Sequence, residues 1–182
     1  MKLVGEIEML AMKIKNCELC RLHEDRKNAV PGEGDRDPDM MFVGEAPGEN
    51  EDIEGKPFVG RAGDLLEELL EEVGLSREDV FITNVVKCRP PDNRDPRKDE
   101  IEACNPYLVK QIECLDPNVI VSLGNHATET LIGEKGIGEL HGKEFEYEDR
   151  ILIPMYHPAA GLYNPNLKET MLEDMRSLQK YI

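Results

Sequence analysis

Short apolar runs alternate with amphipathic segments along most of this chain. Four runs have the length and side-chain types of buried strands: residues 40–43, 80–83, 119–123 and 151–155. Helical patterns lie between and after them, at residues 64–73, 99–115, 125–132 and 166–181. Buried strands that alternate with helices indicate a parallel sheet covered on both faces, so we predict an α/β fold.

The helical pattern is clearest at residues 64–73 and near the N-terminus. In the first segment, leucines recur on one face while glutamates occupy the other. In the second, Ile7, Leu10 and Ile14 share one face. No repeat, low-complexity segment or linker interrupts the pattern, so we expect a single domain over residues 1–182.

Parallel sheets bind ligands beyond the carboxyl ends of their strands. Three predicted strands run into chemically interesting segments there: residues 44–48 (GEAPG), Asn84 and His157. We therefore expect these three segments to meet on one rim. The first segment contains neither the Gly-Lys-Ser/Thr of a triphosphate loop nor the G-x-G-x-x-G of a dinucleotide site, which excludes both.

Three side chains on or near this rim suit a flat, polar ligand. The amide of Asn84 can donate and accept together, as the edge of a nucleobase requires. His157 can donate to a carbonyl oxygen that gains negative charge. Phe58, in a Gly/Pro-rich loop, can stack on a base. Taken singly, each has an ordinary alternative: a turn residue, a structural histidine and a lid over a small apolar pocket.

Composition narrows the class of protein. The 182 residues include 38 acidic and 22 basic side chains, which give a net charge of −16. No run approaches the roughly 18 apolar residues of a membrane span, and acid follows the N-terminus too early for a secretory signal, so we expect a cytoplasmic protein.

The same charge argues against a nucleic-acid partner when it is taken globally. Residues 87–98, however, hold five bases and two acids, and Lys56 and Arg61 add to that rim. A local basic surface on an acidic body remains compatible with DNA.

Five cysteines bear on a possible metal site. Cys17 and Cys20 form a C-x2-C pair, whereas Cys88 and Cys104 are distant in sequence, so folding would have to assemble a four-thiolate centre. Such a centre suits either zinc or an iron–sulfur cluster, and the alternative is four unrelated buried thiols. Cys114 would lie about 15 Å along a helix from Cys104, which excludes it from a shared centre. A disulfide framework is not expected in a reducing compartment.

Four segments together resemble the family 4 uracil-DNA glycosylases, iron–sulfur enzymes of base-excision repair found mainly in archaea and thermophilic bacteria. They are residues 44–48 (GEAPG), 55–63 (GKPFVGRAG), 83–91 (TNVVKCRPP) and 157–160 (HPAA). The resemblance implies a three-layer αβα sandwich around a four-stranded parallel sheet. It also implies a [4Fe-4S] cluster, rather than zinc, that ties the N-terminal segment to the loop after Asn84. The implied ligands are Cys17, Cys20, Cys88 and Cys104.

The resemblance further implies a role for each rim residue. Phe58 would stack on uracil, Asn84 would bind its N3 and O4 edge, and His157 would donate to O2 as the glycosidic bond breaks. The uracil must first be flipped out of the duplex. Because no nucleophilic lysine is needed, we expect a monofunctional glycosylase that leaves an abasic site.

The first rim segment would supply the wall of the pocket and the partner of the attacking water. Glu45, Ala46 and Pro47 would line the pocket. The related family 1 enzymes have a water-orienting Asp where this chain has Ala46, so Glu45 and Glu51 are the candidates for binding the water.

The basic loop and the segment after His157 would contact DNA. The candidates in the loop are Lys87, Arg89, Asn93 and Arg94, and the candidates for a wedge that fills the vacated stack are Leu162 and Tyr163. We expect a monomer that acts on uracil in single- or double-stranded DNA, without a membrane; a sliding-clamp partner cannot be read from the sequence.

Two other functions remain open at this point. One is a noncatalytic or covalently trapping uracil-DNA binder of the same fold, although the trapping relatives carry an added histidine in a basic loop and residues 87–98 contain none. The other is a zinc-stabilised nucleic-acid module without activity.

Overall fold

The computed structural model describes residues 2–182, with side chains from Gly5 onward. Its six strands form one sheet in the order β1-β3-β2-β4-β6-β5. The four central strands run parallel, as predicted: β3 (Phe81–Asn84), β2 (Met40–Gly44), β4 (Val119–Leu123) and β6 (Arg150–Met155). Two short strands that the sequence did not predict pair antiparallel at the margins: β1 (Glu33–Gly34) and β5 (Phe145–Tyr147). The α/β prediction is confirmed, with one strand added at each edge.

Side chains of the central strands alternate between two apolar cores. Along β2, Met41 and Val43 belong to one buried cluster, and Met40 and Phe42 belong to the other. This alternation follows from strand geometry, because successive side chains point to opposite faces. All four side chains are at most 2% exposed, so both faces of the sheet must be covered.

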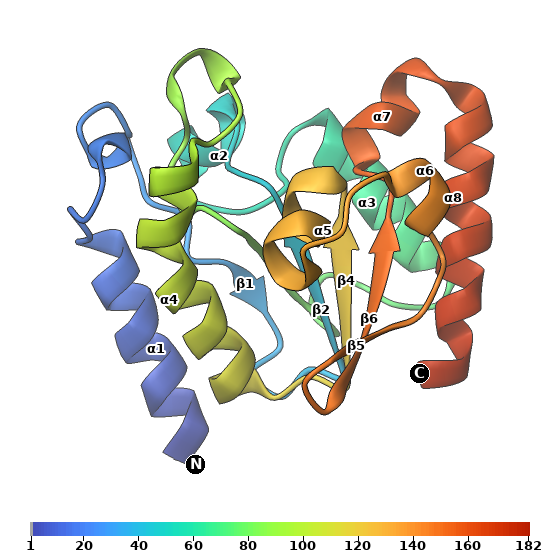
Figure 1. Cartoon of the computed structure of the whole chain (residues 1–182). Coiled ribbons are helices and arrows are strands. Elements are labelled where there is room, and N and C mark those ends of the chain that lie inside the picture. The colour runs from blue at the N-terminus through green and yellow to red at the C-terminus, as the bar shows by residue number, and fades with distance from the viewer. Residues whose placement is uncertain (1) are drawn as a thin grey trace.

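Helices provide that cover and give the molecule three layers (Figure 1). One face carries α1 (Lys2–Lys15), α4 (Lys98–Leu115) and α5 (Asn125–Ile132), and the other carries α3 (Arg61–Glu72), α7 (Pro158–Tyr163) and α8 (Pro165–Ser177). The shorter elements are α2 (Glu49–Glu54), α6 (Ile137–Leu140), η1 (Arg21–His23), η2 (Pro91–Asn93) and η3 (Leu178–Tyr181). None of the helices described within residues 2–182 combines the length and apolar content that crossing a bilayer requires.

The N-terminal helix lies beside α4 (Figure 1). Ile7, Leu10 and Ile14 are each at most 8% exposed and share a core with Leu108 and Ile112 of α4. Apolar packing therefore attaches α1 to the rest of the fold.

The carboxyl ends of the central strands lie at the same margin of the sheet, together with α2 and α7 (Figure 1). Gly44 at the end of β2 pairs with Asn84 at the end of β3, and Leu123 of β4 pairs with Met155 of β6. This register brings together the segments that follow the strands.

Candidate active site and cysteine cavity

A cavity of about 430 Å³ opens at the carboxyl ends of β2, β3 and β6. Its volume falls within the range of small-molecule sites. The lining residues are Glu45, Ala46, Pro47, Gly48, Glu51, Phe58, Ala62, Asn84, Pro90, Asn93, Arg94, Asp95, His157 and Ala159. The three strand-end segments expected from the sequence therefore face one hollow.

Asn84, the last residue of β3, lines this cavity and carries an unpaired side-chain oxygen. Its side chain is only 2% exposed, and Oδ1 has no hydrogen-bond partner within the described part of the chain. The neighbouring residue Gly44 makes room for this amide, since a Cβ there would lie 2.4 Å from Asn84 Oδ1. A buried acceptor without a partner costs stability, so its presence points to a ligand that supplies the donor.

His157 lies between β6 and α7 and is held as a neutral imidazole. Its Nδ1 accepts a hydrogen bond from the backbone N–H of Ala159 at 3.1 Å. This bond assigns the proton to Nε2. Burial lowers the pKa of His157 to about 4, against a smaller opposing effect of the Glu51 carboxylate. At neutral pH, His157 is therefore an uncharged donor through Nε2.

Phe58 forms an aromatic wall beside this histidine. The two rings stack with their centroids 5.5 Å apart and their planes 28° apart. The backbone of Phe58 is left-handed, with φ = 52°, which a residue with a Cβ rarely adopts. Gly63 permits the close approach of α3 to this loop, because a Cβ there would lie 1.8 Å from Phe58 O.

Glu51 has both carboxylate oxygens engaged by the backbone. One oxygen accepts from the N–H of Gly48 at 3.0 Å, and the other accepts from Val59 at 3.1 Å and Gly60 at 3.3 Å. These bonds tie the first rim loop to the loop that carries Phe58. These contacts favour a positioning role for Glu51 over the predicted role in binding the attacking water.

Glu45 belongs to a cluster that the sequence analysis missed in part. The Nε2 atom of His126 lies 3.9 Å from a Glu45 oxygen and 3.3 Å from an Asp95 oxygen. Burial raises the pKa of Glu45; His126 opposes this shift and Asp95 adds to it. His126 is near the start of α5, directly after β4. The strand-end rule, applied to the third predicted strand as well, would have identified it.

Lys87 corrects one prediction about DNA contacts. The sequence places it on the basic rim, but Lys87 is 1% exposed and cannot reach DNA. Its ammonium donates to Asn84 O at 2.6 Å, Thr83 Oγ1 at 2.7 Å and Gln111 Oε1 at 2.6 Å. Burial lowers the pKa of Lys87 to about 7, and a smaller Coulombic effect of Cys104 opposes this shift. Lys87 supports the backbone of Asn84 from inside the protein.

Two other bases of this loop, Arg89 and Arg94, also have partners within the protein. Arg94 lines the cavity but forms a two-bond ion pair with the fully buried Glu100, at 2.7 and 2.9 Å. Arg89 is partly exposed and donates to Asn93 Oδ1 at 2.8 Å. Glu100 therefore neutralises the charge of Arg94, whereas Arg89 keeps its charge because its partner Asn93 is neutral.

The two wedge candidates differ in exposure. Leu162 is partly buried and packs against the core formed by α3 and α8, whereas Tyr163 is 81% exposed at the end of α7. The backbone of Gly161 fits closely there, since a Cβ would lie 2.9 Å from the Leu65 side chain and 3.0 Å from Met171 sulfur. Tyr163 is thus the side chain that extends beyond the surface.

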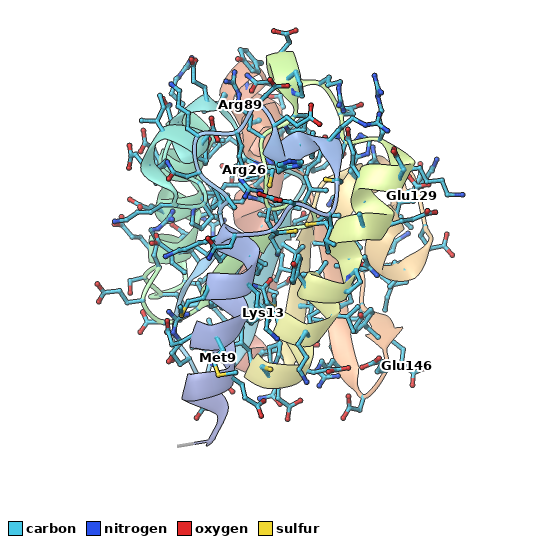
Figure 2. All side chains as sticks on the ribbon, turned by 90° about the vertical axis from the view of Figure 1, so that its left-hand side faces the viewer. Met9, Lys13, Arg26, Arg89, Glu129 and Glu146 are labelled. Carbon is cyan, nitrogen blue, oxygen red and sulfur yellow. The ribbon has the colours of Figure 1, made fainter. Side chains whose placement is uncertain are left out.

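A second cavity gathers the four cysteines. Cys17, Cys20, Cys88 and Cys104 line it, between the end of α1, the segment after β3 and α4. Figure 2 shows sulfur atoms close to the labelled Arg26. Cys114 lies elsewhere, with its thiol 3.6 Å from Glu6 Oε2.

The chemistry of this cavity fits a metal centre with four thiolate ligands. Burial raises the pKa of Cys88 and raises that of Cys104 to about 11, so ionising thiols here requires compensating positive charge. Arg26 donates to Cys88 Sγ at 3.1 Å and to Cys17 O at 2.7 Å. Donors to sulfur are typical of iron–sulfur sites, and four thiolates also suit zinc.

Sequence comparison finds known proteins that are similar to this chain over most of its length. A sequence profile of the uracil DNA glycosylase superfamily matches residues 31–178. The type-4 uracil-DNA glycosylase of Saccharolobus solfataricus is 53% identical over 97% of this chain and 87% of its own length. Those of Archaeoglobus fulgidus and Thermotoga maritima are each 45% identical, over 94% and 97% of this chain and 91% and 94% of their own lengths.

Proposed function

This chain belongs to the uracil-DNA glycosylase superfamily, and within it to the type-4 enzymes, and on this basis we propose that it hydrolyses the N-glycosidic bond of uracil in DNA. The enzyme releases the base and leaves an abasic site. The observation that carries this proposal is the buried Asn84 amide, which lines the cavity and whose Oδ1 has no hydrogen-bond partner in the described part of the chain.

Asn84 and Phe58 recognise the flipped base. Asn84 Oδ1 accepts from the N3–H of uracil while Nδ2 donates to O4, and Phe58 supplies a face on which the ring stacks. Cytosine would present an acceptor to Oδ1 and an amino donor to Nδ2. Both pairings would be repulsive, so the amide selects uracil over cytosine.

His157 assists the departure of the base. Negative charge develops on uracil O2 as the glycosidic bond breaks, and the neutral Nε2–H of His157 donates to it. One such donor lowers a barrier by about 3 kcal/mol, or roughly a hundredfold in rate. The ring is already oriented by its Nδ1 bond to Ala159, so little reorganisation is needed.

Glu45 is the better candidate for binding the attacking water. The carboxylate of Glu51 is engaged by three backbone N–H groups, whereas Glu45 lines the cavity with a raised pKa. A raised pKa makes a carboxylate a stronger proton acceptor. Among the residues that the structure describes, no lysine lines the cavity, which agrees with base release without strand cleavage.

Tyr163 is the proposed wedge, so it should affect the rate of uracil release only from duplex DNA, where stacked bases must be separated. We expect Tyr163→Ala to lower the rate of uracil release from duplex DNA at least tenfold and to leave the rate on single-stranded DNA within about twofold. Leu162→Ala serves as the control for general disturbance of α7. Equal losses on both substrates would contradict the wedge role.

The four cysteines of the second cavity hold a [4Fe-4S] cluster in this proposal. When bound, the cluster supplies a structural link rather than redox chemistry. The four cysteine ligands would come from the segment after α1, the segment after Asn84 and α4, so their shared coordination would link these three parts of the chain. The donor set and Arg26 support this assignment.

The test is incubation of the anaerobically purified protein with a uracil-containing oligonucleotide. Abasic product, with none from the matched thymine oligonucleotide, is the expected result. Absence of that product from protein with its cluster loaded would overturn the proposed activity, and an adduct that resists denaturation would identify a trapping protein instead. Zinc without iron or sulfide would overturn the cluster assignment alone.

A further inference from the structure

The loop that presents Phe58 needs an external support. Phe58 has a left-handed backbone, at φ = 52°, yet its ring is 6% exposed and stacks on His157. Residues with a Cβ rarely adopt this conformation unless their surroundings hold them there. Contacts to the backbone of residues 57 and 58 can provide that support.

Arg77 makes these contacts. It lies in the turn between α3 and β3, and its guanidinium donates to Phe58 O at 2.8 Å and to Pro57 O. Glu33 of β1 accepts from the same guanidinium at 3.0 Å, and a Glu67 oxygen of α3 lies 3.5 Å away. The Arg77 side chain is 16% exposed, so these interactions are largely shielded from water.

The geometry assigns a positioning role to Arg77. We propose that its planar fork fixes two consecutive carbonyls and so holds the ring of Phe58 against the uracil site. This inference rests on the proposed function, because it concerns the stacking wall of that site. Phe58 belongs to the cavity lining and Arg77 does not, so Arg77 acts through Phe58 rather than on the substrate.

The loop is held from both sides of Phe58. Arg77 binds the carbonyls of residues 57 and 58, and Glu51 binds the N–H groups of Val59 and Gly60. Without Arg77, the first half of the loop can relax toward an ordinary backbone conformation. A lysine cannot replace the guanidinium fully, because a single ammonium does not reproduce the planar fork.

The test is a double-mutant cycle between Arg77→Met and Phe58→Ala in the cluster-loaded enzyme. We expect Arg77→Met to lower kcat/KM for uracil DNA about tenfold when Phe58 is present, and by less than about twofold in the Phe58→Ala background. Arg77→Met should also reproduce the kcat-against-KM split of Phe58→Ala. Arg77→Lys should recover only part of the loss. The same factor in both backgrounds would overturn the proposal.

Glu67→Gln is the matched control. It weakens an ion pair of Arg77 but leaves both carbonyl bonds, so kcat/KM should stay within about twofold of the wild type. A tenfold loss in this variant would assign the effect to the ion pair and contradict positioning through the carbonyls.

A second readout separates this inference from the proposed function. The ring protons of His157 report on the stacked ring of Phe58 in the NMR spectrum, and the chain has four histidines to assign. Arg77→Met and Phe58→Ala should shift these resonances in the same direction. Wild-type protein that leaves uracil DNA intact would overturn the function, whereas unchanged His157 resonances in Arg77→Met would overturn the role of Arg77.

Discussion

The unpaired oxygen of Asn84 leads to a prediction about Asn84→Ala. This substitution leaves the N3–H and O4 of a bound uracil without partners inside a closed site. An unsatisfied buried polar group costs about 1–3 kcal/mol, so two such groups cost about 4 kcal/mol. If the cost falls on the transition state, the rate of uracil release falls about a thousandfold.

The same substitution should barely change the stability of the protein. Asn84 Oδ1 has no partner within residues 2–182, so alanine removes an acceptor that was unsatisfied in the uncomplexed protein. We expect the free energy of unfolding to change by less than about 1 kcal/mol. A structural role would produce the opposite pattern, with a large loss of stability and a proportionate loss of active protein.

Two measurements on one preparation test this reasoning. Single-turnover release of uracil from a labelled oligonucleotide gives the rate, and urea unfolding under anaerobic conditions gives the free energy of unfolding. Iron content confirms equal cluster loading in the two proteins. A rate loss below tenfold would refute the role in base recognition. A stability loss above about 3 kcal/mol would refute the claim that the amide serves the ligand.

Three further predictions follow from the same geometry. Gly44→Ala should lower kcat/KM on the uracil oligonucleotide at least about a hundredfold, since its Cβ would lie 2.4 Å from Asn84 Oδ1, and a near-native rate would contradict this. Burial lowers the pKa of His157 to about 4, so the folded protein binds a proton at this residue only near pH 4, whereas the unfolded chain binds it near pH 6.5. His157 should therefore lower the free energy of unfolding by about 3 kcal/mol as the pH falls from 7 to 4. Urea unfolding of His157→Gln should show a correspondingly weaker pH dependence. Cys104→Ser should lose iron on purification while the matched Cys114→Ser keeps it, and equal iron contents would refute the assigned ligand set.

The sheet could be predicted because its strands obey a simple rule. Met40 and Phe42 face one core and Met41 and Val43 face the other, so β2 appears in the sequence as an unbroken apolar run. The strands β1 and β5 have two and three residues, which is too short for any periodicity to be detected.

Only the site residues that lie at or near the ends of strands could be predicted from the sequence. Asn84 ends β3 and His157 comes shortly after β6, and the structure brings both to one cavity. The error at Lys87 has a physical cause: a sequence records the charge of a side chain but not its direction, and this ammonium turns inward to three oxygens. The contacts of Glu51 could not be predicted for a similar reason, because they depend on the path of loops that carry no periodic pattern.

The short strands at the margins of the sheet also affect how the protein behaves when it is crowded or partly unfolded. An open edge offers unpaired N–H and C=O groups as a template on which another chain can add a strand. Here β1 offers two residues and β5 three, and β5 carries the exposed charge of Glu146 (Figure 2). Edges of this length offer an incoming strand too few backbone hydrogen bonds for stable pairing, so the fold resists edge-to-edge aggregation. The central strands remain long enough to position the site.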